Sequence, residues 1–233
     1  MGIPRMFDDI IKRHLNVNAA WLPITNNYTL GDYGIITDGV FAKLGNIQEF
    51  NVPFTAADGP DASIDFTSAN TTVIKFAAGA QVDVIPEGAI DAKITFKFGN
   101  ERSFMVKAPV IKVSAIQNVN QVAIKLRDTK NWGRRWKVVY QVYNAHDPLL
   151  VSTITANTEL TLSGNAEALR KVKVGDASLE LGTTKELGLN VHGKAGIIGL
   201  GLFKLKTGDG GPKVLGSNVI QVLDNKSPLE EDL

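Results

Sequence analysis

The sequence predicts an α+β protein built on a twisted, mainly antiparallel β-sheet with long hairpins and a few short helices. Apolar and polar residues alternate with a period of two from Tyr33 onward, which is typical of strands with one face in water. Helical spacing is confined to two short stretches, at the N-terminus and around residues 116–126. We expect one β-rich domain over residues 1–206, a flexible glycine-rich linker at 207–213 and a short C-terminal tail at 214–233.

The first element is an amphipathic helix over Pro4–Leu15, with proline in its first turn, where the missing N–H costs nothing. Asp8 and Asp9 precede Lys12 and Arg13, an order that complements the helix dipole, and Asp8 is expected to face water. The apolar face, which packs on the core or contacts a membrane, consists of Met6, Phe7, Ile10, Ile11 and Leu15.

The strands come next. The clearest alternation covers Ile90–Phe98 and resumes over Phe104–Val110 after a turn at residues 99–101, so we expect these two segments to form a hairpin. A short helix around residues 116–126 crosses between sheet segments. The stretch at 136–143 is rich in β-branched and aromatic residues, and 195–205 is apolar and glycine-rich; both are expected strands.

Composition and motifs argue against an enzyme. The 233 residues include no cysteine, so the chain has no disulfide, thiolate metal site or thiol nucleophile, and a reducing cytoplasmic location fits best. His14, His146 and His192 lie in unrelated contexts, and the chain has no nucleophile elbow, Walker loop or complete dinucleotide fingerprint. We expect no catalytic residue, cofactor or metal. An enzyme whose carboxylate or serine chemistry is assembled from distant residues stays open as an alternative.

A basic cluster stands out against a formal net charge of only +1. Two tryptophans are interleaved with its cations, and Asp128 is the only acid among them. Such a surface suits anionic lipid headgroups or single-stranded nucleic acid, although the whole-chain charge gives no reason to expect nucleic-acid binding. A solvated loop with one buried tryptophan is an equally open reading. The candidate anionic-lipid contacts are Lys125, Arg127, Lys130, Arg134, Arg135, Lys137, Trp132 and Trp136.

The tail is acidic. Residues 214–233 carry a net charge of −3, so the rest of the chain carries +4. Its apolar residues, Val219, Ile220, Val222 and Leu223, are candidate autoinhibitory contacts that could dock on the body, although ordinary packing of a chain end is the simpler explanation for them. The candidate cleavage loop before the tail consists of Thr207, Gly208, Asp209, Gly210, Gly211, Pro212 and Lys213.

This order of elements resembles the pore-forming domain of the gasdermins, especially the compact bacterial members. The resemblance rests on the N-terminal helix Met6–Leu15, the segments at 21–24, 31–34 and 40–47, the alternating hairpins, the tryptophan-containing basic connection, and the glycine-rich link to a short tail. Some bacterial members carry a lipidated cysteine near the N-terminus, and this chain has none.

The resemblance implies a cytoplasmic, autoinhibited protein whose tail is cut by an activating protease. The freed body would bind anionic lipids of the inner membrane and form a homo-oligomeric β-barrel pore that kills the cell as a defence against phage. The candidate inserting hairpins are Thr72–Ile116 and Thr153–His192. The alternative is a β-rich, non-enzymatic ligand-binding or structural module in which the tail is permanently packed.

Overall fold

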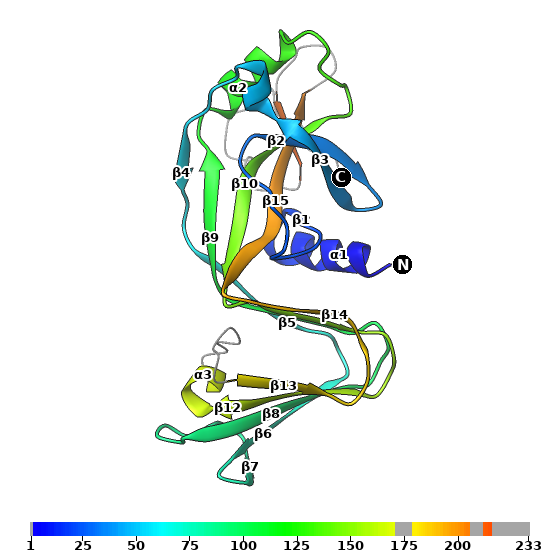
Figure 1. The fold of residues 1–233 in the computed structure, drawn as a ribbon, viewed down its shortest axis with the longest axis vertical. Helices are drawn as coiled ribbons and strands as arrows, with labels where there is room; N and C mark the ends of the chain where they lie inside the picture. The colour runs from blue at the N-terminus through cyan, green and yellow to red at the C-terminus, as the bar shows by residue number, and fades with distance from the viewer. Residues whose placement is uncertain (1, 171–178, 206–211, 216–233) are drawn as a thin grey trace. The chain divides into compact units, whose positions relative to one another are not determined.

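The computed structural model describes residues 2–170, 179–205 and 212–215; for Leu179 and residues 212–215 it describes the backbone (Figure 1). The helices are α1 (Ile3–Leu15), the 3-10 turn η1 (Ile47–Phe50), α2 (Val119–Arg127) and α3 (Ala166–Arg170). The strands are β1 (Asn18–Ala19), β2 (Asp32–Thr37), β3 (Val40–Asn46), β4 (Ala56–Asp58), β5 (Ala62–Thr67), β6 (Thr71–Ala77), β7 (Ala80–Val82), β8 (Asp91–Phe98), β9 (Phe104–Ile116), β10 (Lys137–His146), β11 (Leu149–Thr153), β12 (Thr158–Asn165), β13 (Leu179–Thr183), β14 (Leu187–His192), β15 (Ala195–Leu205) and β16 (Pro212–Leu215).

The chain forms two compact units, each made of discontinuous segments. Unit 1 takes residues up to 61, residues 112–144 and residues from 197 onward; unit 2 takes residues 62–111 and 145–196. The described strand pairs in both are antiparallel, and the helices are short, which confirms the expected α+β class.

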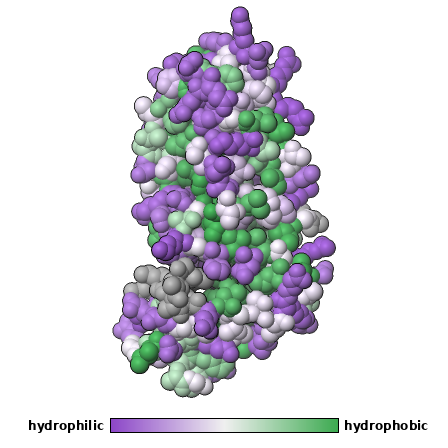
Figure 2. Space-filling model, in the orientation of Figure 1, coloured by the Kyte–Doolittle hydropathy of each residue, from purple (hydrophilic) through white to green (hydrophobic). Residues whose placement is uncertain are grey.

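Unit 1 is a twisted sheet with α1 beside β1 (Figure 1). Strand β15 pairs with β1 and β16, and β2 pairs with β10 and β3. The N-terminal helix and the helix at 119–127 both form as predicted, within three residues of the expected bounds. Hydrophilic residues cover most of the upper end of the view in Figure 2, where α2 and its connection to β10 lie.

The prediction that Asp8 of α1 faces water is wrong, because its side chain is buried. Its Oδ1 accepts a hydrogen bond from the backbone N–H of Ala19 at 2.8 Å, and its Oδ2 accepts one from Lys12 Nζ at 2.7 Å. The helix lies against β1, so the N–H of Ala19 is shielded from water and requires an acceptor. The carboxylate of Asp8, one turn before Ile11 on the helix, supplies this acceptor.

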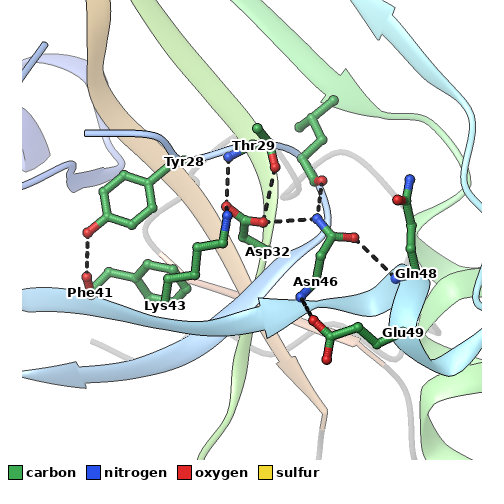
Figure 3. A network of polar contacts seen from close by, with 9 residues as sticks. Tyr28, Thr29, Asp32, Phe41, Lys43, Asn46, Gln48 and Glu49 are labelled. Carbon is green, nitrogen blue, oxygen red and sulfur yellow. Dashed lines mark hydrogen bonds and ion pairs between the residues drawn. The ribbon is translucent and has the colours of Figure 1, made fainter. Parts of the chain in front are cut away.

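A polar network fixes the β2–β3 hairpin of unit 1 (Figure 3). Asp32 is fully buried; its carboxylate accepts hydrogen bonds from Thr29 N, Thr29 Oγ1 and Asn46 Nδ2 at 2.8–3.0 Å, and pairs with Lys43 Nζ at 2.8 Å. Asn46 caps η1 through a capping box with Glu49. The burial of this charge is therefore compensated at both carboxylate oxygens.

Unit 2 is a two-layer sandwich. One layer has the strand order β5-β9-β11-β14, and the other has the order β13-β12-β8-β6-β7. The layers share one hydrophobic core, to which β8 contributes Ile94, Phe96 and Phe98, β9 contributes Met105, and β11 contributes Leu149 and Val151. Figure 1 shows β5 and β14 facing β12 and β13 across it.

The expected hairpin between residues 90–98 and 104–110 is wrong. Strand β8 pairs with β6 and β12, whereas β9 pairs with β5 and β11, so the two segments belong to different layers. Residues 99–103 bend the chain from one layer to the other and do not reverse it onto itself. Apolar alternation on both sides of a turn is the same for a bent strand and for a hairpin, which is why the sequence pattern misled.

The backbone at the end of the described chain also differs from expectation. Pro212 and Lys213, expected in the flexible linker, belong to β16, which pairs with β15 in the register Leu205↔Pro212 and Lys204↔Lys213. The remaining candidate cleavage residues, Thr207–Gly211, and the tail residues Val219, Ile220, Val222 and Leu223 lie outside the described residues.

Candidate functional site

Four long strands of unit 2 pass through both layers of the sandwich. They are β5–β6, β8–β9, β11–β12 and β13–β14. Each long strand has the same neighbours in both layers. The strands bend at residues 68–70, 99–103, 154–157 and 184–186, which we name the bend segments. Unit 2 therefore contains one four-stranded antiparallel sheet folded over on itself.

The bend segments hold a backbone conformation that a β-strand does not contain. Asn70, Arg102 and Asn157 have φ values of 60°, 56° and 53°, in the left-handed region. Side-chain-bearing residues adopt this region at a cost, which is smallest for asparagine and aspartate. Each of three bends thus depends on one residue that would relax to an extended conformation if the strand straightened.

Buried hydroxyl groups complete the central bend. Thr153 faces both Arg102 and Ser103, because its carbonyl accepts from Arg102 N at 3.0 Å and its N–H donates to Ser103 O at 2.9 Å. This is a β-bulge, in which two residues oppose one. Thr153 Oγ1 accepts from Ser103 N at 3.0 Å, and Ser103 Oγ donates to Asn100 O at 3.0 Å, so the interrupted ladder leaves these groups satisfied.

The two central strands keep one register through the bend. In the first layer Ser152 is opposite Phe104, and in the second layer Thr158 is opposite Phe98. Each strand advances six positions between these two pairs, so the bend contains the same number of residues on both. Straightening the two strands would extend the existing ladder without any slippage between them.

In straight strands, this register would also gather most of the apolar residues on one face, since side chains alternate. The even-numbered face would carry Ala92, Ile94, Phe96, Phe98, Phe104, Val106, Ala108, Leu150, Leu160 and Leu162. The odd-numbered face would carry Lys93, Thr95, Lys97, Glu101, Ser103, Lys107, Thr153, Thr155, Glu159, Thr161 and Ser163. Two cross-strand contacts already link this polar face, the ion pair Lys97–Glu159 at 2.7 Å and the Thr95–Thr161 hydroxyl pair at 3.2 Å.

The faces are not clean near the bend. Asn100, Arg102, Ser152 and Thr158 would join the apolar face, and Met105, Leu149 and Val151 would join the polar face. In the folded sandwich, Met105 and Val151 instead face the same core as Phe96. In both strands the core-facing side chains are even-numbered on one side of the bend and odd-numbered on the other, so the alternation shifts by one residue within the bend. The bend therefore selects which set of side chains is buried.

The outer strand β5–β6 adds a second effect. Between Thr67↔Met105 and Thr71↔Phe98 it advances four positions while its neighbour advances seven. If the register of β5 with β9 is kept, straightening slides β6 by three residues and exchanges its faces. Lys75 would leave the apolar face and Ile74 and Phe76 would join it.

The segment between β6 and β8 carries two strongly exposed apolar residues. Ile90 is 80% exposed and Val84 is 70% exposed, the two largest values among the large hydrophobic residues that the structure describes. An exposed apolar tip on a sheet is a feature of interaction sites, including sites that contact lipid.

The basic cluster lies in unit 1, on α2 and on the connection to β10. Lys125, Arg127, Lys130, Arg134 and Arg135 are exposed. Within the described chain, Arg127 forms an ion pair with Asp128 at 3.4 Å, and the other four form no salt bridge. Lys137 is half-buried at the start of β10.

The indoles of this cluster are packed into an aromatic group. The ring centroid of Tyr33 lies 5.5 Å from that of Trp132 and 4.8 Å from that of Trp136, and the two indoles are 5.1 Å apart. A Cβ at Gly133 would come within 2.6–2.7 Å of the Trp136 ring, so only glycine fits there. Burial, and secondly Glu49, raises the pKa of Tyr33. The aromatic group thus fixes the shape of a connection whose cations face water; lipid contact by these residues stays a prediction.

The apolar face of α1 is packed within unit 1. Phe7 and Ile11 are fully buried, and the Phe7 ring lies 6.3 Å from Trp21, whereas Met6, Ile10 and Leu15 are half-buried. This arrangement satisfies the core interpretation of the helix face; a membrane contact would require α1 to leave its place, and that stays a prediction.

The described residues contain no group of three or more His, Asp or Glu side chains placed to hold a metal. Among the helices of the described segments, none combines the length and apolar character that a bilayer-crossing helix requires.

Comparisons with known proteins add one structural similarity. No family model matches the sequence, and no curated protein matches it. A solved structure of a bacterial gasdermin from Bradyrhizobium tropiciagri is similar over 91% of this chain and 90% of that chain, with 13% sequence identity and a TM-score of 0.40. This is the family that the order of sequence elements resembles.

Proposed function

We propose that this chain is a pore-forming protein whose folded sheet opens at the bend segments. The four strands straighten into two long hairpins, 62–116 and 149–192, which insert into a membrane. The observation that carries the proposal is the common register of the central strands on both sides of the bend, which brings most of the apolar residues of these strands onto one face. The two hairpins contain the whole of both candidate inserting segments, Thr72–Ile116 and Thr153–His192.

The dimensions of the sheet fit a bilayer. Strand β8 has eight residues and β12 has eight residues. At about 3.3 Å per residue such a strand spans about 26 Å, close to the apolar band of membrane β-barrels at about 25 Å. The layer β6-β8-β12-β13 would therefore cross the membrane. Asn100 and Arg102 would then lie at the headgroup level, where polar side chains are not penalised.

A membrane-spanning sheet must close on itself, because unpaired strand edges cannot be hydrated in lipid. Four strands are too few to enclose a channel. The active form is therefore a homo-oligomer in which each copy contributes two hairpins, with the polar odd-numbered face of the central strands lining water.

Removal of the C-terminal tail would activate the protein. An activating protease would cut within 207–213, and loss of residues 214–233 would raise the net charge of the body from +1 to +4. The exposed cations Lys125, Arg127, Lys130, Arg134 and Arg135 would then draw the body to anionic lipids, at about 1 kcal/mol for each basic residue near the surface. The resemblance to gasdermins adds the biological setting: a cytoplasmic protein that permeabilises the inner membrane and causes cell death in phage defence.

Dye release from liposomes tests the proposal. A specific protease site is placed at Gly210–Gly211, and release from anionic vesicles is measured for the intact and the cut chain, with tail dissociation verified by size-exclusion chromatography. We expect release only after cutting, since the tail keeps the body from opening. A cut chain that has lost its tail and releases no dye at any lipid composition would contradict the proposal and favour the β-rich ligand-binding or structural module.

A further inference from the structure

Unit 2 encloses a half-open cavity of about 500 Å³ between its two layers. Its walls combine polar residues with the buried apolar residues Ile85, Ile94, Phe96, Leu162 and Leu169. The volume lies within the range of about 300–1,000 Å³ that small-molecule sites occupy.

The charges at the cavity are unevenly neutralised. Lys107 forms an ion pair with Asp65, so these two compensate each other. Lys75 Nζ donates to the backbone carbonyl of Asp83 at 3.0 Å, a neutral partner, while the Asp83 side chain is exposed to water. Arg170 Nη1 lies 3.8 Å from Glu87 Oε1, and the Glu87 side chain is 95% exposed. Lys75 and Arg170 are thus two cations beside an apolar wall whose charge is weakly balanced.

From this combination we infer that the cavity binds an amphipathic monoanion with a short aliphatic chain, such as a medium-chain carboxylate. The chain lies along Ile94, Phe96 and Leu162, where its burial removes apolar surface from water. The carboxylate accepts charge-assisted hydrogen bonds from Lys75 or Arg170. A neutral ligand would leave both cations without a better partner, and a cationic ligand would meet repulsion from them.

Such a ligand would touch both layers of the sandwich, since Lys107 lies on β9 in one layer and Lys75 lies on β6 in the other. A ligand that binds the folded form and not the opened form stabilises the folded form by mass action. This regulatory consequence rests on the proposed function, whereas the binding site itself does not.

Binding of octanoate to the intact, uncut chain tests the inference by isothermal titration calorimetry, with octan-1-ol and octyltrimethylammonium as the neutral and cationic probes of equal chain length. We expect octanoate to bind most tightly and octyltrimethylammonium most weakly. Equal binding of the three probes, or no binding of octanoate at millimolar concentration, would overturn the inference. No membrane is present, so failure of this experiment is distinct from failure of the pore proposal.

Three variants locate the site. Arg170→Gln removes one cation and is expected to weaken octanoate binding by about tenfold. Val73→Trp, at a cavity position that is 45% exposed and therefore tolerant of a larger side chain, should block all probes. Lys97→Gln is the matched control, since Lys97 lies on the opposite face of β8, pairs with Glu159 and does not line the cavity. Arg170→Gln and Lys97→Gln variants that bind octanoate equally well would show that the charge at the cavity does not select the ligand.

Discussion

Asp32 shows how much of unit 1 depends on one residue. Its carboxylate is fully buried and holds Thr29, Lys43 and Asn46 together across the β2–β3 hairpin (Figure 3). Removing one partner of a buried, hydrogen-bonded ion pair leaves the other partners without compensation, which costs far more than the pair contributes.

Asp32→Ala is therefore expected to lower the free energy of unfolding by about 3 kcal/mol. Asp61→Ala is the control, because the Asp61–Lys112 pair is about half-exposed on both sides and such pairs contribute about 1 kcal/mol or less. Urea denaturation followed by tryptophan fluorescence measures both. Equal losses for the two variants would show that the Asp32 network does not stabilise the fold.

At the scale of elements, the bend segments decide whether unit 2 is a sandwich or a long sheet. The left-handed residues favour the bend only while the rest of the sandwich holds them there, and the hydroxyls of Ser103 and Thr153 replace the ladder hydrogen bonds that the bulge removes. Substitutions that change only the backbone preference at a bend should change how readily the sheet opens.

Asn157→Gly and Asn157→Val test this point in opposite directions. Glycine favours the left-handed conformation and weakens a straight strand, whereas valine favours the straight strand, each by about 1 kcal/mol or roughly fivefold in the opening equilibrium. We expect the cut chain to release dye more slowly with glycine and faster with valine. Asp38, with a φ of 53° in the β2–β3 turn of unit 1, is the matched control for the same two substitutions. Dye-release rates that respond alike at positions 38 and 157 would mean that the bend does not control opening.

At the scale of the whole molecule, charge determines where the protein would insert. The intact chain is almost neutral, and the basic cluster is the local exception, with four cations that make no salt bridge within the described chain. Attraction between such a cluster and an anionic membrane is electrostatic, so it should weaken as salt is added.

Reversal of three charges, Arg127→Glu, Arg134→Glu and Arg135→Glu, is expected to abolish binding of the cut chain to anionic vesicles in a sedimentation assay. The control triple Arg5→Glu, Lys112→Glu and Lys194→Glu changes the net charge equally at exposed positions outside the cluster and should retain most of the binding. Binding that is lost in both triples would assign the effect to net charge, and binding that survives in the first would exclude the cluster as the lipid contact.

The sequence by itself determined the class of fold and most of the elements. Period-two alternation located the strands, and i, i+4 spacing located α1 and α2, because these signals arise from burial of one face of a single element. The strand at 195–205 was predicted to the residue.

Only the tertiary structure decided which strands pair. Residues 90–98 and 104–110 were expected to form a hairpin. The residues between them are compatible with both a bend and a hairpin turn. Which of the two forms depends on pairing with β5, β6, β11 and β12, which lie far along the chain. The burial of Asp8 and the cavity beside Lys75 and Arg170 also depend on residues distant in sequence. Local sequence patterns indicate which face of an element is buried. They do not indicate which other element it packs against, and the proposed opening of the sheet depends on those partners.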